Sequence, residues 1–544
     1  MLKKNDIIHL NITSATADGS GVGKTEDGIA VFVPLSAVGD ELNVRILKVK
    51  KTYAFGKTEE IITPSKSRTE PDCGCFSRCG GCVWRHITYE EECRLKSQKV
   101  ADALERIGGI STELKPIIPS ARVLRYRNKA QLPIGKAPDG SLLMGFYAFH
   151  SHRIIDCGDC ALQPEIFAKV MKITRDFIAQ TDNDIYDEKT GKGRLRHLYI
   201  RYGEVTDELM VCYVVNGNGL KREDLLLDML KKGLPNLKTV IVNSNREKTN
   251  VILGSKNRTV YGSGFITDVL CGLKFKISPF SFWQVNRAQA ERLYEKAREY
   301  AALSGNETLL DLYCGTGTIG LTMAKDCKEL IGVEIIEDAV RDAENNAAVN
   351  SICNARFMCS DAPKAAAQLE SEGVRPDAVI LDPPRKGCGE ELVRTIGKMN
   401  PDRVVYVSCD PATLARDLKY FSEIGYETKE VTPVDMFPRT AHVETVVLLS
   451  RKMPDDKIEV DLDLDELDIT SAESKATYQE IKDHVLKEYG FKVSTLYISQ
   501  VKRKCGIIER ENYNPSRKEN PHISQCPKDK EAAIRAALEH FRMI

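Results

Sequence analysis

The sequence predicts a multidomain α/β protein whose second half forms a doubly wound, mostly parallel sheet. A small closed β-barrel of the OB type precedes this sheet, with a β-rich central domain between them, and an α+β appendage follows it. Three observations support this fold class. The 544 residues exceed one core at about 150 residues per domain. Short alternating strands fill the first 62 residues, and strands alternate with helical stretches from Glu307 onward.

The barrel is indicated by segments such as Ile7–Ile12 and Ile29–Val33, which alternate apolar and polar residues around Gly-rich turns. Such barrels bind single-stranded nucleic acid through basic side chains that follow the phosphates. The residues available for this are Arg45, Lys48, Lys50, Lys51 and Lys57. Charges that are merely solvated are the alternative interpretation.

We expect a helix from Tyr89 to Ile107 and then a β-rich region from about Ile117 to Val269. Basic and aromatic residues interleave in this region, a pattern that suits single-stranded RNA. They are Arg194, Arg196, His197, Tyr199, Arg201 and Tyr202. The predicted domain boundaries are 1–64 for the barrel, 65–270 for the central domain, 271–451 for the α/β domain, 452–470 for a linker and 471–544 for the appendage. The helix near 89–107 should pack on the α/β domain.

The predicted α/β domain contains strands at 309–314, 329–334, 356–361, 378–382, 404–409 and 443–449. In such sheets the site lies at the carboxyl ends of the strands. Beyond Arg451, the acidic run Asp455–Asp468 predicts a solvated linker. In the appendage, Lys502-Arg503-Lys504 is the most basic patch, which we expect to contact long RNA.

Lys plus Arg equals Asp plus Glu at 78 each, so overall charge neither favours nor excludes a nucleic-acid partner. The first residues lack the apolar run of a signal peptide, and no apolar stretch approaches a membrane span of roughly 18 residues. These features predict a cytoplasmic protein with no membrane partner. In a reducing compartment, the 17 cysteines indicate metal ligands, nucleophiles or core residues instead of disulfides.

The turn Asp311–Gly317 continues into the pattern Gly315-x-Gly317-x-x-Gly320, and Glu334 ends the next strand. This combination suits a nucleoside cofactor, either NAD or S-adenosylmethionine (SAM), because both present ribose hydroxyls to an acid. The strand-end turn Asp382-Pro383-Pro384-Arg385 favours SAM, since it resembles the motif of SAM-dependent methyl transfer to nucleic-acid bases.

Ser408-Cys409-Asp410-Pro411 and His442-Val443-Glu444 supply a thiol and a carboxylate on successive strands. Carbon 5 of uracil is a poor nucleophile, but addition of a thiolate to carbon 6 makes it strongly nucleophilic. Cys409 precedes a helix whose N-terminal amides would favour the thiolate. Glu444 is the candidate base that removes the carbon 5 proton after methylation.

Together with Phe282-Trp283-Gln284-Val285-Asn286, these segments resemble the bacterial RNA 5-methyluridine (uracil-C5) methyltransferases, in particular the 23S ribosomal RNA branch (RlmD/RumA-like). The resemblance runs from about Lys4 to Arg451. It implies a Rossmann-like SAM methyltransferase domain and an N-terminal TRAM domain. It also implies that Cys409 is the nucleophile, that Glu444 is the base, and that SAM or uracil contacts Gln284, Tyr313, Glu334, Asp361 and Asp382. Two positions depart from the family pattern: Thr318 replaces the asparagine of some members, and Asp410 replaces a commoner asparagine.

The cysteine cluster after the barrel allows two interpretations. Cys75-x3-Cys79-x2-Cys82 has the spacing of radical SAM enzymes, whereas Cys73-x5-Cys79-x2-Cys82 with a distant Cys160 resembles the spacing of this family. We prefer a structural [4Fe-4S] cluster held by Cys73, Cys79, Cys82 and Cys160, because the Cys/Glu route needs no radical. Zinc is the alternative metal, and Cys75 and Cys157 are alternative ligands.

The sequence therefore predicts a monomeric, SAM-dependent RNA uracil-C5 methyltransferase that acts on 23S ribosomal RNA and carries a [4Fe-4S] cluster. The resemblance favours 23S ribosomal RNA over tRNA, because the family's tRNA branch lacks both cluster and barrel. Two alternatives stay open at this point: a tRNA uracil-C5 methyltransferase, and an RNA-binding scaffold or chaperone with a decayed methylase. The presence of both Cys409 and Glu444 disfavours the scaffold.

Overall fold

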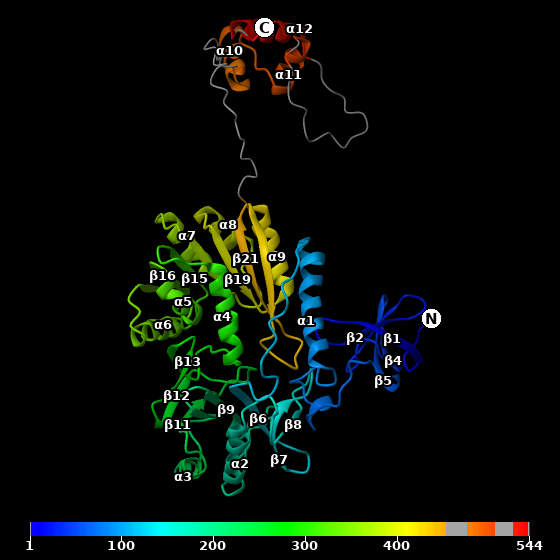
Figure 1. Cartoon of the computed structure of the whole chain (residues 1–544), viewed down its shortest axis with the longest axis vertical. Helices are drawn as coiled ribbons and strands as arrows, with labels where there is room; N and C mark the ends of the chain where they lie inside the picture. Colours follow the sequence, from blue (N-terminus) through cyan, green and yellow to red (C-terminus); the bar gives the residue numbers. More distant parts are fainter. Residues whose placement is uncertain (1, 453–475, 506, 508–525, 542) are drawn as a thin grey trace. The chain divides into compact units, whose positions relative to one another are not determined.

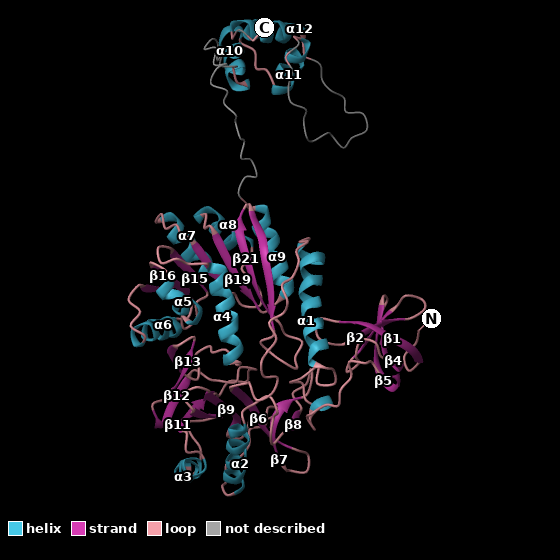
Figure 2. Ribbon diagram, viewed as in Figure 1, coloured by secondary structure: helices cyan, strands magenta, loops and turns pink. Residues whose placement is uncertain are grey.

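The computed structural model describes residues 2–452, 476–505, 507, 526–541 and 543–544 (Figures 1 and 2). The chain divides into two compact units, Met1–Met453 and Pro454–Ile544. Among the described residues, every helix is too short or too polar to cross a membrane. The predicted acidic linker Asp455–Asp468 lies outside the described residues.

The N-terminal segment forms a closed barrel with the strand order β1-β2-β3-β5-β4. Side chains alternate along these strands, so that Leu10, Ile12, Val31 and Val44 fill the interior while their neighbours face outward. The closed barrel confirms the predicted OB-type barrel. Its strands are β1 (Ile7–Ala15), β2 (Gly21–Lys24), β3 (Ala30–Val33), β4 (Glu41–Val49) and β5 (Tyr53–Thr63).

A seven-stranded sheet follows in the order β12-β11-β10-β9-β6-β7-β8, and a separate hairpin pairs β13 with β14. Two helices that the sequence analysis did not predict pack on this sheet: α2 (Glu165–Ala179) and α3 (Glu223–Gly233). Helix α2 buries Phe167, Val170 and Phe177, an amphipathic spacing that was present in the sequence. The strands are β6 (Lys129–Lys136), β7 (Leu142–Tyr147), β8 (Ile154–Asp156), β9 (Leu195–Gly203), β10 (Glu208–Val215), β11 (Leu237–Ser244), β12 (Lys256–Gly262), β13 (Ile266–Leu270) and β14 (Leu273–Ile277).

The predicted RNA-contacting cluster of this region is wrong for most of its members. Arg196, His197, Tyr199 and Arg201 lie in β9 at the centre of the sheet, and each is at most 7% exposed. Their polar atoms serve the protein itself: Arg196 donates hydrogen bonds to the carbonyls of Asn245 and Glu247. Central strands are covered on both faces, so these side chains are not available to contact RNA.

The α/β sheet has the strand order β17-β16-β15-β18-β19-β21-β20 (Figure 1). The five strands from β17 to β19 are parallel, and β21 runs antiparallel to both β19 and β20. This arrangement confirms the predicted Rossmann-like fold. The strands are β15 (Thr308–Leu312), β16 (Glu329–Glu334), β17 (Ala355–Cys359), β18 (Ala378–Leu381), β19 (Arg403–Ser408), β20 (Tyr426–Val434) and β21 (Glu444–Arg451).

Successive residues of the buried strands face opposite sides, and each side has its own helical layer. Leu309, Ile380 and Val405 pack in one cluster with α4, α5 and α6, whereas Leu310 and Val379 pack in the other with α7, α8 and α9. The helices are α4 (Arg287–Ala301), α5 (Thr318–Met323), α6 (Glu337–Val349), α7 (Ala362–Ser371), α8 (Glu390–Met399) and α9 (Pro411–Glu423).

Helix α1 (Tyr89–Ala103) joins this second layer although it precedes the sheet by some 200 residues in the chain. Thr88 caps its first turn, and Val100 and Leu104 pack with the cluster that contains Leu414 and Leu418 of α9. The N-terminal part of the chain is thereby attached directly to the α/β domain.

The second unit contains three helices among its described residues: α10 (Tyr478–Tyr489), α11 (Thr495–Lys504) and α12 (Lys528–His540). Ile481, Ile498 and Ile534 are fully buried in their common core. The described part of this unit is helical, so the strands of the expected α+β appendage are not found there.

Candidate active site

The predicted site residues lie at one edge of the α/β sheet. Tyr313 and Asp382 follow β15 and β18, and Glu334 ends β16. Cys409 follows β19, and Glu444 begins the antiparallel strand β21. Because the register pairs Ser408 with Thr445, Cys409 and Glu444 are neighbours across adjacent strands. The carboxyl ends of parallel strands and the start of an antiparallel one meet at the same edge.

The turn after β15 brings the start of α5 within hydrogen-bonding distance of Asp311. Tyr313 and Gly317 have φ angles of 68° and 80°, which place both in the left-handed region. The backbone amide of Gly320 donates to Asp311 Oδ2 at 2.9 Å, and a Cβ at Gly320 would lie 2.7 Å from that oxygen. The other carboxylate oxygen, Asp311 Oδ1, is buried without a hydrogen-bond partner. An unpaired buried acceptor at this position is suited to a ligand donor.

Glu334 is fixed by its own loop. Its Oε2 accepts a hydrogen bond from the Gly315 amide at 3.1 Å, and its Oε1 accepts one from the Ile336 amide at 3.0 Å. The carboxylate is therefore oriented before any ligand arrives. Asp361 follows β17 by two residues and begins α7, and Gln284 is buried in the segment before α4. All five predicted cofactor residues belong to the α/β domain or the segment that leads into it.

The nucleophile candidate is held by the start of α9. Asp410 is the helix cap, and its carboxylate accepts hydrogen bonds from the amides of Ala412 at 2.9 Å and Thr413 at 3.3 Å. The carboxylate, and not the Cys409 sulfur, thus occupies these N-terminal amides. Burial, reinforced by the charges of Glu444 and Asp382, raises the pKa of Cys409 to about 11. The expectation that the helix would favour the thiolate is wrong for this state of the site.

Three carboxyl groups of the site prefer the neutral form. Burial raises the pKa of Glu444 to about 8, with Asp382 contributing further and Arg385 opposing. Burial also raises the pKa of Asp382 to about 7 and that of Asp311 to about 8. A concentration of buried acids with raised pKa values is characteristic of functional sites.

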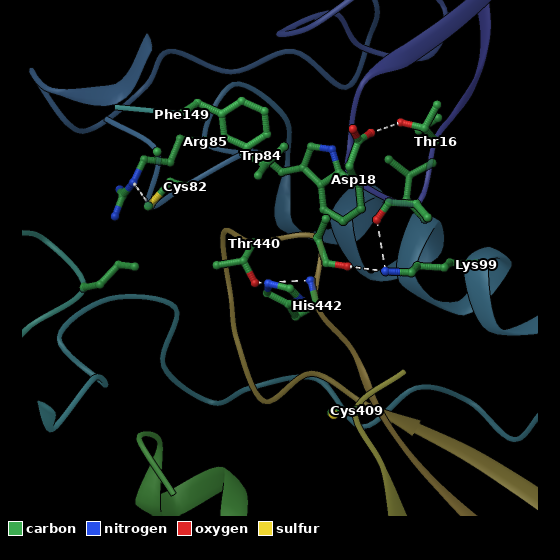
Figure 3. Close-up of a pocket in the computed structure, with 18 of the residues that line it drawn as sticks. Thr16, Asp18, Cys82, Trp84, Arg85, Lys99, Phe149, Cys409, Thr440 and His442 are labelled. Atoms are coloured by element: carbon green, nitrogen blue, oxygen red, sulfur yellow. Dashed lines mark hydrogen bonds between the residues drawn. The ribbon is translucent and has the colours of Figure 1, made fainter. Parts of the chain in front are cut away.

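A cavity of about 1100 Å³ opens beside Cys409 (Figure 3). It is lined by segments that are distant in the chain: the barrel loop around Thr16 and Asp18, Lys99 of α1, and His442 of the loop before β21. Cys409, Asp410 and Arg385 contribute from the α/β domain. The predicted cofactor residues are not among the residues that line this cavity. Its position suits the substrate that the thiol attacks.

Six cysteines line the far part of the same cavity: Cys73, Cys75, Cys79, Cys82, Cys157 and Cys160. Burial raises the pKa of Cys79, Cys82 and Cys160, and neighbouring thiols raise each of them further. Across the described residues, however, no group of three or more His, Cys, Asp or Glu side chains is arranged to hold a metal ion. The thiols share one cavity, but they are not arranged around a common point. The predicted [4Fe-4S] ligation therefore stays a prediction.

Lys99 and His442 were not among the predicted site residues. Lys99 Nζ donates to the carbonyls of Ala17 at 3.0 Å and Ala441 at 2.9 Å, which ties the barrel loop to the loop before Glu444 (Figure 3). Burial lowers the pKa of His442 to about 4, so its imidazole is neutral. His442 was visible in the sequence beside Glu444, but no sequence signal connects Lys99 to either loop.

The fold and the strand-edge site together define a Rossmann-like methyltransferase. Residues 226–452 match the family model described as tRNA (Uracil-5-)-methyltransferase, and residues 3–58 match the TRAM domain. The chain is 44% identical over 452 residues to a protein of Halalkalibacterium halodurans named as an uncharacterised RNA methyltransferase. The aligned region covers 83% of this chain and 98% of the relative. A similarly named protein of Clostridium tetani is 44% identical over 449 residues, or 82% of this chain and 97% of the relative. The chain therefore belongs to the RNA (uracil-5-)-methyltransferase family.

Among solved structures, the chain resembles the Pyrococcus abyssi tRNA (uracil-54, C5)-methyltransferase, which was determined in complex with S-adenosyl-L-homocysteine. The TM-score is 0.66 at 29% sequence identity, and the likeness covers 81% of this chain and 100% of the other. This comparison supports the α/β domain and much of the chain before it as one shared architecture.

Proposed function

We propose that this protein methylates carbon 5 of uracil in RNA, using SAM as the methyl donor and Cys409 as a covalent nucleophile. The observation that carries the proposal is the placement of Cys409 and Glu444 on adjacent strands β19 and β21, at the carboxyl edge of a Rossmann-like sheet. A thiol and a buried carboxyl group side by side are what addition to carbon 6 and proton removal from carbon 5 require.

The electrostatics of the edge support SAM as the donor. SAM carries a positive sulfonium, and burial raises the pKa values of Asp382 and Asp311 at this edge. A bound cation would favour the charged form of both carboxyl groups. Glu334 is oriented to accept hydrogen bonds from ribose hydroxyls, and Gln284, Tyr313 and Asp361 complete the proposed contacts to SAM or uracil.

In the proposed reaction, the Cys409 sulfur forms a bond to carbon 6, and the ring electrons move onto carbon 5 as an enolate. Carbon 5 then takes the methyl group from the sulfonium, which leaves as the neutral thioether S-adenosylhomocysteine. Glu444 accepts the proton from carbon 5, the electrons of that bond restore the double bond between carbons 5 and 6, and the carbon–sulfur bond breaks to release Cys409. The chain supplies the nucleophile, the base and the orientation of both reactants.

The N-terminal barrel supports an RNA substrate. Phe32, Tyr53 and Phe55 form an aromatic group on its outer face, with ring centroids 5.5–5.7 Å apart, and Phe55 is 40% exposed. Exposed rings of this kind stack on unpaired bases. Of the predicted phosphate contacts, Arg45 and Lys57 are paired with Glu59, whereas Lys48, Lys50 and Lys51 are exposed.

We propose 23S ribosomal RNA as the substrate, on the family resemblance of the barrel and the cysteine cluster. The second candidate is tRNA, because the matching family model and the Pyrococcus abyssi relative are both named for tRNA. Nucleoside mapping in a deletion strain separates the two: loss of 5-methyluridine from 23S ribosomal RNA alone supports the first, and loss from tRNA alone supports the second.

The covalent step is tested with RNA that carries 5-fluorouridine at the target position. We expect the wild-type enzyme to become trapped on this RNA, because fluorine replaces the proton that Glu444 must remove. Cys409→Ala should give neither product nor adduct, whereas Glu444→Gln should accumulate a methylated protein–RNA adduct on ordinary RNA. Denaturing gels with labelled SAM detect both species.

Two results would contradict these roles. A normal rate in Cys409→Ala, or a stable adduct in that variant, would mean that another cysteine attacks, and Cys314 in the turn after β15 is the next to examine. Free 5-methyluridine formed at the wild-type rate by Glu444→Gln would remove Glu444 as the base.

We also propose that the cysteines of the cavity bind a structural [4Fe-4S] cluster through Cys73, Cys79, Cys82 and Cys160. The supporting observation is that all four thiols line one cavity. Protein purified without oxygen should contain iron and sulfide, and methylation should need no added reductant. Zinc without iron would favour the alternative metal, and production of 5′-deoxyadenosine would favour radical chemistry over the polar route.

A further inference from the structure

The loop between β20 and β21, residues 435–443, carries His442 and leads directly into Glu444. Its backbone is held mainly by residues outside the sheet. Carbonyls of the loop accept hydrogen bonds from six groups that precede β15 in the chain: the side chains of Asn286, Lys96, Tyr126 and Lys99 and the backbone amides of Val83 and Trp84. The conformation of this loop is therefore decided largely by the central region and α1.

Lys96 of α1 is the centre of this support. Its side chain is fully buried, and its ammonium donates to Glu92 Oε1 at 2.7 Å, to Asp435 Oδ1 at 2.6 Å and to the Phe437 carbonyl at 3.1 Å. The three donors of the ammonium group are thus all used, two of them by the loop.

The surrounding groups complete the arrangement. Tyr89 donates from its hydroxyl to Asp435 Oδ2 at 2.6 Å, and Glu92 Oε1 accepts the backbone amide of Arg439 at 2.6 Å. Arg439 has a φ of 70°, and its guanidinium lies 3.6 Å from Glu92 Oε2. The side chains of Lys96 and Arg439 therefore meet those of Glu92 and Asp435 in the interior. Burial raises the pKa of Glu92, and the charge of Lys96 opposes that rise.

A buried charge cluster of this type is weak evidence for stability, because apolar side chains of similar volume stabilise a fold as well or better. What such a cluster does provide is a single geometry, since each charge must keep its partners. Here the cluster fixes the geometry of the loop 435–443, which leads into the candidate base Glu444. The nucleophile is held separately, by Asp410 and α9.

We propose that Lys96 is a positioning residue for Glu444: through Asp435 and the Phe437 carbonyl it sets the loop so that the carboxylate faces the adduct on Cys409. This inference rests on the proposed function. Misplacement of a reacting group by about 1 Å can cost about 100-fold in rate. Loss of Lys96 should therefore slow proton removal while leaving addition and methyl transfer nearly intact.

The test uses the full-length enzyme, a substrate RNA transcript and labelled SAM. Lys96→Met should lower the rate of 5-methyluridine release about 10–100-fold and accumulate the methylated adduct, with the KM for SAM within about threefold of wild type. Tyr89→Phe removes one hydrogen bond to Asp435 and should show the same partition to a smaller degree. Lys172→Met is the matched control, because Lys172 forms an exposed ion pair with Asp176 on α2 and should behave as wild type.

If Lys96 has a purely structural role, the amounts of adduct and of product should both fall in proportion to the folded fraction. The inference would be overturned if Lys96→Met and Tyr89→Phe both gave this result. If Lys96→Met fails to fold, Tyr89→Phe alone decides. Wild-type enzyme that forms no 5-methyluridine would instead overturn the proposed function, so the two failures are distinguishable.

Discussion

Cys409 and Glu444 occupy surroundings that favour the neutral form of both side chains. Their pKa values of about 11 and about 8 both follow first from burial. At pH 7 a thiol of this pKa is ionised in roughly one molecule in ten thousand. Arrival of the sulfonium and of the uracil must therefore change the electrostatics before the thiolate can add. At the scale of the residue, burial disfavours ionisation of both groups while the site is without its substrates.

The pH dependence of the reaction follows from the pKa of Glu444. The base works only when it is deprotonated, and its pKa of about 8 keeps it protonated at neutral pH. We expect the turnover rate to rise between about pH 6 and pH 9, since ionisation of the thiol increases in the same direction. Single-turnover rates at saturating SAM and RNA measure this profile. A flat or falling rate across that range would contradict the assignment of Glu444 as the base.

Burial of the Glu444 carboxyl group should make the folded protein less stable as the pH rises. Its pKa is 4.5 in the unfolded chain and about 8 in the folded protein, so the stability it contributes is fully present below pH 4.5 and is lost as the pH rises through 8. Glu444→Gln removes the ionisable group, and we expect it to stabilise the protein at pH 8 by about 1–3 kcal/mol. Thermal melts of the two proteins at pH 5 and at pH 8 should show the difference growing with pH; no growth would mean that Glu444 is already ionised in the fold.

At the scale of the element, the turn from β15 into α5 depends on one close approach. Gly320 lies on the first turn of α5, and its amide reaches Asp311 because no side chain intervenes. Gly320→Ala would place a Cβ 2.7 Å from the Asp311 carboxylate. We expect a loss of about 1–3 kcal/mol in stability and at least tenfold weaker binding of S-adenosylhomocysteine, measured by titration calorimetry.

Gly397→Ala is the matched control for this prediction. A Cβ at Gly397 would also meet an atom at 2.7 Å, but that atom is the terminal Cδ1 of Ile424, which can move. Gly397 lies in α8, away from the cofactor turn, so cofactor affinity should be unchanged. Equal losses of affinity in both variants would show that the effect is general destabilisation and not the geometry at Asp311.

At the scale of the whole molecule, the second unit has its own core, and the family match ends at residue 452. The predicted basic patch of this unit is largely engaged within it. Lys502 is 6% exposed and lies 4.2 Å from the centroid of the Tyr478 ring, and Lys504 pairs with Glu531 at 2.7 Å. Arg503 and Lys504 are exposed, but the charge of Lys504 is shared with Glu531.

We therefore expect truncation after Lys452 to leave methylation of a short RNA intact. Because Lys502 is buried and Lys504 is paired with Glu531, the slope of log affinity for long RNA against log salt should change by less than about one. Filter binding at several salt concentrations measures the slope. A truncated enzyme that folds and binds SAM but methylates no RNA would show that the second unit takes part in catalysis.

The sequence by itself determined the closed barrel, the order of strands and helices in the α/β domain, and the position of Cys409, Glu444, Glu334 and Asp382 at strand ends. These follow from local patterns: alternation of apolar residues, Gly-rich turns, and acids or thiols at strand ends. Such patterns act within a few residues, so they can be read without knowing the fold.

Only the tertiary structure decided how those residues are surrounded. It buried Arg196 and Arg201 in a central strand, and it raised the pKa of Cys409, where the sequence had indicated a thiolate. It also brought Lys96 and Lys99 against a loop more than 300 residues away. Burial, protonation and long-range hydrogen bonds depend on which elements pack together, and one sequence contains no local signal for those contacts.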